Sequence, residues 1–180
     1  MKQPLTTNLS DERRLHIKSL QGNIEGVLRT SPSLRTLDDL NLVARNFLTL
    51  HGPSVDGERW GDQQTRMALS KASILFVIEE TGTLGPRSID PETYRRAPLR
   101  LRIADFDIQG FLHVPHGGDP MQRLNQDGHP FVALTSASIV GPGVELAVPF
   151  LAVNRQRIAL AVELPTRESE TEAPVEAIVS

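Results

Sequence analysis

Two stretches of the chain carry nearly the same alternation of apolar and polar positions. Residues 66–79 read RMALSKASILFVIE, and residues 150–163 read FLAVNRQRIALAVE. In each stretch two apolar runs flank a short polar turn, which is typical of two β-strands joined by a tight reversal. A shift of 84 residues, the spacing between Ile74 and Ile158, superimposes the two stretches.

The same shift aligns the chain further upstream without a gap. It places Phe47 on Phe131, and it places NIEGVL on DIQGFL, so that Gly26 and Gly110 coincide. A glycine inside a strand predicts a sharp bend or close backbone approach, here at a barrel corner. One register over so long a stretch indicates an internal duplication. The predicted organisation is a flexible N-terminus, β unit copy one, a connector, β unit copy two and a disordered acidic tail, at residues 1–14, 15–80, 81–98, 99–164 and 165–180.

The repeat also resolves an ambiguity between helix and strand. Residues 36–50 taken alone place apolar side chains at helical spacing and would predict one long helix. The equivalent stretch of copy two contains Asp-Gly and then Pro130 directly before Phe131, a sequence that ends a helix and leads into a strand. A short helix near 36–43, repeated near 120–126, satisfies both copies.

The remaining segments of each copy predict five short antiparallel strands. A sheet of five short strands exposes two edges, and closure into a small barrel removes them. We therefore expect a mainly β protein made of two tandem small five-stranded antiparallel barrel-like units from an internal duplication, with short helical turns. Ile74→Asp and Ile158→Asp are both expected to unfold the protein, because each would bury a charge in an equivalent core position.

The motifs shared by the copies resemble a group of uncharacterised small bacterial β domains. That group combines I-x-G-x-L, L-N, F-x-x-L and V-N-K/R-x-x-I, and its own function is unknown. Copy two departs from the pattern at Asp119 and Gln122. The residues that match are Arg35, Asp38, Leu40 and Asn41 in copy one, and Val153, Asn154, Arg155 and Ile158 in copy two.

The repeat is also loosely similar to Sm-like barrels, whose second strand carries a glycine and whose last two strands meet at a tight basic turn. This resemblance implies RNA binding. The arginine-glycine pair expected at the turn is replaced by Ser70-Lys71 in copy one and by Asn154-Arg155 in copy two. The departure removes the part of the pattern that is most closely tied to RNA.

Candidate interaction residues follow from these turns and from one aromatic side chain. Trp60 lies in the polar loop VDGERWGDQQ, where it is either an exposed anchor for a partner or, as we favour, a cap over the barrel mouth. Asn41 and Asn125 either present their side chains to a ligand or, as we favour, hydrogen-bond the turn backbone. The candidate interaction set is Trp60, Lys71, Asn154 and Arg155.

The segment HVPHGGD places His113, His116 and Asp119 at spacings that could ligate zinc. A loop lacks the helical geometry that gives such a pair its specificity, so we favour a polar hairpin loop and predict no metal site. The sequence contains no G-x-S-x-G, P-loop or G-x-G-x-x-G motif. We therefore expect no catalytic residues and no cofactor.

Charge and composition narrow the class of partner. The stretch after Leu164 carries the whole net charge of −3, so the body of the chain is electrically balanced. A basic cluster that includes Arg100, Arg102 and Arg155 is interleaved with Asp105 and Asp107, which favours a paired, solvated face. This balance argues against a generic phosphate-binding surface.

The chain has no cysteine, no apolar run long enough to cross a bilayer and no apolar stretch typical of a secretory signal at its start. We therefore expect a cytoplasmic protein with no membrane contact. The expected function is a non-enzymatic interaction or scaffold module that binds protein partners or self-assembles. The alternative is a nucleic-acid-binding protein of Sm-like type.

Overall fold

The structure, a computed structural model, describes residues 11–80, 90–126 and 128–165. We call residues 11–80 half one and residues 90–165 half two. Half one contains β1 (Asp11–Ser19), β2 (Gly22–Thr30), α1 (Thr36–Asn41), β3 (Phe47–Val55), β4 (Glu58–Arg59), β5 (Arg66–Ser70), the 3-10 turn η1 (Lys71–Ser73) and β6 (Ile74–Glu79). Half two contains β7 (Tyr94–Ile103), β8 (Phe106–Pro115), α2 (Pro120–Leu124), β9 (Phe131–Gly141), β10 (Val144–Asn154), the 3-10 turn η2 (Arg155–Arg157) and β11 (Leu160–Glu163).

The two halves repeat the same pairing pattern at the offset of 84 residues. Ile24 lies opposite Val55 in the β2–β3 pair, and Ile108 lies opposite Ile139 in the β8–β9 pair. The turns η1 and η2 follow the same offset, as do the first residues of β3 and β9. One difference is that β10 is a single long strand, whereas its counterpart in half one is divided into β4 and β5.

The helices α1 and α2 confirm the prediction of one short helix in each copy, in place of a single long helix over residues 36–50. Each helix ends before the strand that follows it, where a single long helix would have consumed the third strand. The side chain of Asp119 accepts a hydrogen bond from Met121 N at 2.8 Å, and Pro120 stands in the first turn of α2. Both features favour a helix start, because the side chain satisfies a free backbone N–H and proline has none to satisfy.

Gly26 and Gly110 mark the same irregularity in both halves. The register of β2 with β3 shifts around Gly26, and that of β8 with β9 shifts around Gly110. A Cβ atom on Gly26 would lie 2.9 Å from the Cβ of Leu50, and one on Gly110 would lie 3.2 Å from the Cβ of Leu134. The glycines therefore permit close backbone approach at a bulge, as the sequence predicts.

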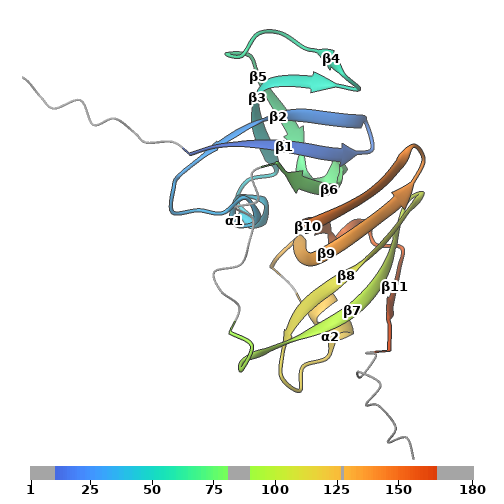
Figure 1. Cartoon of the computed structure of the whole chain (residues 1–180). Coiled ribbons are helices and arrows are strands. Elements are labelled where there is room, and N and C mark those ends of the chain that lie inside the picture. The colour runs from blue at the N-terminus through green and yellow to red at the C-terminus, as the bar shows by residue number, and fades with distance from the viewer. Residues whose placement is uncertain (1–10, 81–89, 127, 166–180) are drawn as a thin grey trace, which may run out of the picture.

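All eleven strands belong to one antiparallel open sheet, and the prediction of two closed barrels is wrong. The strand order is β11-β7-β8-β9-β10-β6-β1-β2-β3-β4, with β5 paired to β3 beside β4. A barrel in half one would need β5 to pair with β6, but β6 pairs with β10 of half two (Figure 1). The hydrogen-bonding edge that would close the barrel is therefore occupied by the other half.

Strand β6 and residues 150–154 of β10 are buried on both faces, which explains their nearly continuous apolar sequences. Ile74 and Val77 of β6 belong to the core of half one, whereas Phe76 packs in the core of half two. Phe150 and Ala152 of β10 pack in the core of half one in turn. Each half thus completes its core with side chains from the other.

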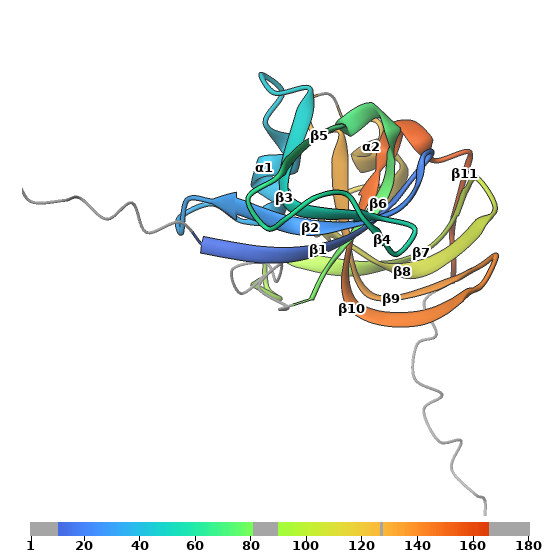
Figure 2. The same cartoon turned by 90° about the horizontal axis from the view of Figure 1, so that it is seen from above.

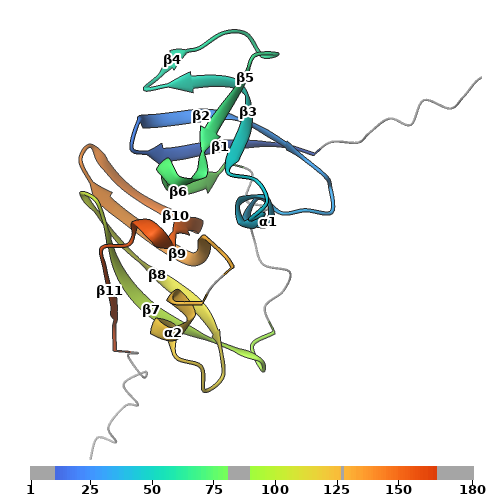
Figure 3. The same cartoon turned by 180° about the vertical axis from the view of Figure 1, so that it is seen from behind.

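The arrangement places the unpaired edges at opposite ends of the molecule. From behind, β4 lies at one end and β11 at the other (Figure 3). Seen from above, the long hairpins β7–β8 and β9–β10 lie on one side and the two helices lie toward the other (Figure 2). In the described ranges no helix is long and apolar enough to cross a membrane.

The predicted flexible N-terminus, connector and acidic tail lie largely outside the described residues. The parts that lie outside are residues 1–10 of the predicted flexible N-terminus, 81–89 of the predicted connector and 166–180 of the predicted acidic tail. Of the described part of the connector, residues 90–93 form a turn in which Asp90 O accepts hydrogen bonds from the backbone N–H groups of Thr93 and Tyr94, and residues 94–98 already belong to β7. Residues 11–14, expected to be flexible, belong to β1.

Ile74 and Ile158 were expected to be equally buried, but the order of strands in the sheet buries only Ile74 completely. Ile74 is fully buried between strands on both sides, whereas Ile158 is half-buried next to the edge strand β11. Ile74→Asp should lower the free energy of unfolding by more than about 4 kcal/mol, and Ile158→Asp by about 1–3 kcal/mol. Urea denaturation followed by circular dichroism measures both, and equal losses would contradict the open sheet.

Candidate interaction surfaces

The contact between the halves shows how this fold joins two β units. Ala152 of β10 lies opposite Val77 of β6, and Val153 lies opposite Phe76. Each of these strands also pairs with a neighbour in its own half, β10 with β9 and β6 with β1. The halves are therefore joined by backbone hydrogen bonding along strand edges as well as by shared core side chains.

Asn154, predicted to contact a partner, lies inside this contact between the halves. Its side chain is buried, and its Nδ2 donates hydrogen bonds to Lys71 O at 3.2 Å and Ile74 O at 2.8 Å. Its Oδ1 accepts a hydrogen bond from Gln156 N at 3.1 Å. One amide thus satisfies two carbonyls of half one while it caps the turn η2 of half two.

Asn41 makes a second polar link across the same contact. Its Nδ2 donates to Phe131 O at 3.1 Å, and its Oδ1 accepts from Phe131 N at 2.8 Å, so the amide mimics a strand partner for one residue. We predicted that this asparagine would bond the turn backbone of its own copy, but its partner belongs to half two. Its equivalent, Asn125, bonds Met121 O of its own helix at 3.0 Å.

Lys71 and Arg155, the basic turn residues, point toward the ends of the short helices. Lys71 Nζ donates to Asp39 O at 2.7 Å and to Leu42 O at 3.1 Å. Arg155 Nη1 donates to Leu124 O at 2.9 Å and to Gln126 O, which is the equivalent of Leu42 O in half two. Burial lowers the pKa of Lys71, an effect that the nearby Asp39 carboxylate opposes. Both cations thus bond backbone carbonyls at the C-terminal ends of the short helices, where a positive charge is favourable.

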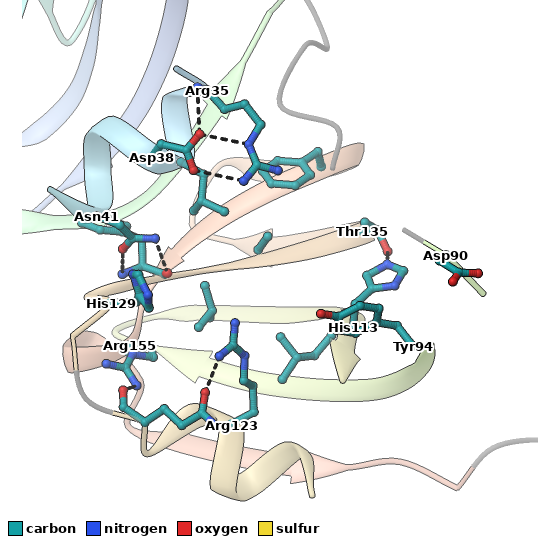
Figure 4. A pocket seen from close by; sticks show the side chains of 17 residues that line it. Arg35, Asp38, Asn41, Asp90, Tyr94, His113, Arg123, His129, Thr135 and Arg155 are labelled. Atoms are coloured by element: carbon teal, nitrogen blue, oxygen red, sulfur yellow. Dashed lines mark hydrogen bonds and ion pairs between the residues drawn. The ribbon is translucent and has the colours of Figure 1, made fainter. Parts of the chain in front are cut away.

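A groove of about 490 Å³ runs beside the contact between α1 and half two (Figure 4). Arg35 and Asp38 form an ion pair at one rim, with Nη2 and Oδ1 3.0 Å apart. Across the groove, His113 Nε2 lies 2.9 Å from the hydroxyl of Thr135. Each of these two pairs is satisfied within its own half, while His113 Nδ1 is buried without a hydrogen-bond partner among the described residues.

Trp60 follows directly after the edge strand β4 and is exposed. It does not fold back onto a core, and the barrel mouth that it was expected to cap is not formed. Its backbone N–H donates to Pro53 O at 2.9 Å, which fixes the loop without covering the indole. The side chain is therefore exposed at the β4 end of the sheet. This agrees with the alternative in which Trp60 is an exposed anchor for a partner.

The open edges are features that the sequence interpretation missed. Among the described strands, β11 pairs only with β7, and β5 pairs only with β3. The side chains of Leu160 and Val162 on β11 are exposed, although their equivalents on β6 are not. No signal in the sequence separates the two strands, because both read as the last strand of a repeat.

The histidine loop is held by internal bonds. His116 Nε2 lies 2.9 Å from Pro91 O, His113 bonds Thr135, and Asp119 caps α2. Within the described part of the chain no three histidine or carboxylate side chains form a metal-binding cluster. The structure therefore leaves these residues in separate structural roles.

Two of the four arginines of β7, Arg100 and Arg102, are paired with the same acidic residue. Arg100 Nη2 lies 2.6 Å from Asp107 Oδ2, and Arg102 Nη2 lies 3.3 Å from the same oxygen. Hydrogen bonding from Arg100, together with both positive charges, lowers the pKa of Asp107. This is the paired face that the interleaved charges predict.

Comparison with known proteins adds no relative. The chain matches no protein-family model, no curated protein and no solved structure. The motif resemblances therefore stay predictions, and the function is argued from the geometry.

Asn41 and Asn125 form a matched pair for testing the link between the halves. Asn41→Ala removes both bonds to Phe131 and should lower the free energy of unfolding by about 2 kcal/mol, because it leaves two backbone groups without their partner. Asn125→Ala should cost less than about 1 kcal/mol, since it removes one exposed bond. Thermal and urea denaturation at low protein concentration compare the two, and equal losses would argue against the cross-half role.

His113 should make stability depend on pH. Burial, reinforced by the positive charge of Arg96, lowers the pKa of His113 from its ordinary 6.5. The unfolded chain then binds this proton at higher pH than the folded chain does, so the contribution is complete about one pH unit above 6.5 and is lost as the pH falls through 6.5 toward the lower pKa of the folded state.

The free energy of unfolding should therefore fall between about pH 7.5 and pH 5.5, and His113→Gln should flatten that fall. His51, whose pKa burial also lowers, will leave a residual slope. His116→Gln is the matched control, because its ring lies exposed against Pro91 O. An unchanged slope in His113→Gln would remove the proposed linkage.

Proposed function

We propose that the chain is a non-enzymatic interaction module, a scaffold or assembly subunit that joins proteins through the open edges of its sheet. The observation that carries the proposal is the β11 edge, where Leu160 and Val162 are exposed beside a row of backbone groups that pair on one side only among the described strands. Strand addition to such an edge obtains affinity from backbone hydrogen bonds and specificity from alternating side chains.

The composition of this edge supports recruitment of a strand. Proteins commonly protect an exposed edge with lysine, proline or a covering loop, because an unprotected edge pairs with other chains. The strand β11 has Leu160, Ala161 and Val162 in succession, and its charged residue, Glu163, stands at its end. The internal contact between β6 and β10 provides a precedent within the same chain, since there an equivalent edge is filled by another strand.

Nucleic-acid binding of the Sm-like type receives less support from the same geometry. Lys71 and Arg155, at the turn that the resemblance implicates, donate to backbone carbonyls of their own halves. Phosphate contacts need cations that can reach a backbone of negative charges. The arginine pair on β7 is shared with Asp107.

The test compares partners isolated with the unchanged protein and with two lysine variants. Val162 on β11 and Val140 on β9 are each 53% exposed, so Val162→Lys and Val140→Lys add the same charge at equally accessible sites. Gentle affinity isolation from the source cells should recover a protein set that Val162→Lys loses and Val140→Lys retains. Recovery of one unchanged set by all three proteins would refute the edge as the binding surface.

Nucleic acid in the same preparations is measured before and after a salt wash. Binding through phosphates weakens steeply as salt rises, so salt-releasable nucleic acid that Val162→Lys leaves unchanged would favour the alternative function. Little nucleic acid in all three preparations is the result that the edge proposal expects.

A further inference from the structure

We infer that the partner at the open edge is a second copy of this chain, whose β5 pairs with β11 in the register that joins β10 to β6 within one chain. The inference rests on the proposed function and names its partner. The contact within one chain serves as the template for the contact between two chains. In it, β10, the next-to-last strand of one repeat, lies beside β6, the last strand of the other repeat. The same two positions remain open at the ends of the sheet, on β5 and on β11.

The backbone of β11 presents the required groups. In an antiparallel pair, hydrogen-bonded residues alternate with residues whose N–H and C=O point away from that partner. Leu164 N donates to Pro98 O, so the residues of β11 that face away from β7 include Ala161. The equivalent residue of β6 is Val77, which pairs with Ala152 across the internal contact.

The backbone of β5 is oriented in the complementary way. Lys71 N donates to Asn46 O, and by the same alternation Ala68 directs its N–H and C=O away from β3. Ala68 is the equivalent of Ala152 at the offset of 84 residues. Two copies of the chain can therefore repeat the Ala152–Val77 pair as Ala68–Ala161.

The side chains are compatible along the whole pairing. Each cross-strand pair joins either two apolar residues or two opposite charges, and both kinds favour antiparallel pairing. Extended over β11, the register of the internal contact gives the pairs Leu160–Leu69, Ala161–Ala68, Val162–Met67 and Glu163–Arg66. Glu163 also lies 3.6 Å from Arg95 of its own half, so it can bridge two arginines.

Residues at the open edges are far more exposed than the equivalent residues at the contact between β6 and β10, as expected if the open edges lack a partner strand. Phe76 of β6 is 4% exposed, whereas Leu160 at the same position of β11 is 65% exposed. Phe131 of β9 is 1% exposed, whereas Phe47 at the same position of β3 is 57% exposed. Pairing of two copies would cover both sets in one step.

The asparagine link can repeat as well. Asn41 brackets the backbone of Phe131 from the other half. At the offset of 84 residues, Asn125 of one copy takes the place of Asn41, and Phe47 of the next copy takes the place of Phe131. Asn125 is exposed and needs to give up only its bond to Met121 O.

Two sequence differences between the repeats make the contact between two copies weaker than the contact between β6 and β10 within one chain. Ser70 stands where Asn154 bonds two carbonyls, and Arg66 stands where Phe150 enters the core of half one. A charge pair thus replaces part of the apolar contact, and salt screens such a pair. We expect reversible, concentration-dependent and salt-sensitive association.

The symmetry of the contact determines the kind of assembly. Pairing β11 of one copy with β5 of the next joins two different surfaces, so each added copy leaves both kinds of edge open at the ends. Such head-to-tail contacts build a ring where the rotation closes and a filament where it does not.

The experiment is sedimentation velocity on the purified full chain over a concentration series, at low and at high salt. The unchanged protein and Val140→Lys should associate, and Val162→Lys should raise the apparent dissociation constant at least about tenfold. Circular dichroism checks that each variant is folded. Monomer at every concentration for the unchanged protein would overturn the inference, as would equal association of Val162→Lys and Val140→Lys.

A charge exchange tests the register independently. Arg66→Glu alone and Glu163→Arg alone each place like charges opposite one another and should weaken association, and the double variant should restore it. Lack of rescue by the double variant would overturn the register. If the purified chain is monomeric while affinity isolation still recovers Val162-dependent partners, the second-copy inference fails and the proposed function stands.

Discussion

The contact between β6 and β10 is the interaction on which the rest of the structure depends. Two ladder pairs, Ala152–Val77 and Val153–Phe76, join sheets that would otherwise be separate. Because β6 and residues 150–154 of β10 are buried on both faces at this contact, each half uses core side chains from the other. Neither half has a complete core by itself, so the stability of the halves is coupled through this contact.

The same contact determines where the molecule can interact. By filling the edge of β6, it prevents half one from closing on itself, and it leaves the β5 edge without that partner. At the other end, β11 occupies the position of β6 but has no strand beside it in the described sheet. A repeat that joins through one edge leaves one edge of each kind at its ends, and the proposed function rests on these two edges.

Local features of the fold followed from the sequence because they depend on nearby residues. The interruption before Phe131 predicted short helices, and those observed span six and five residues. The bulges at Gly26 and Gly110 appeared where close backbone approach was expected. The candidate site was predicted less well. Asn154 and Lys71 were identified as special, but their partners are backbone carbonyls inside the protein, and no sequence pattern specifies which carbonyl an amide or ammonium group will meet.

The sequence by itself determined the β character, the offset of 84 residues and the apolar runs of the last strands. Only the tertiary structure decided that the sheet stays open and that Ile74 is buried while Ile158 is half-buried. The physical reason is that a strand edge offers the same N–H and C=O groups to any partner, so sequence periodicity defines the strand but not its neighbour. The neighbour is chosen by which cores can be completed at once, a property of the whole chain.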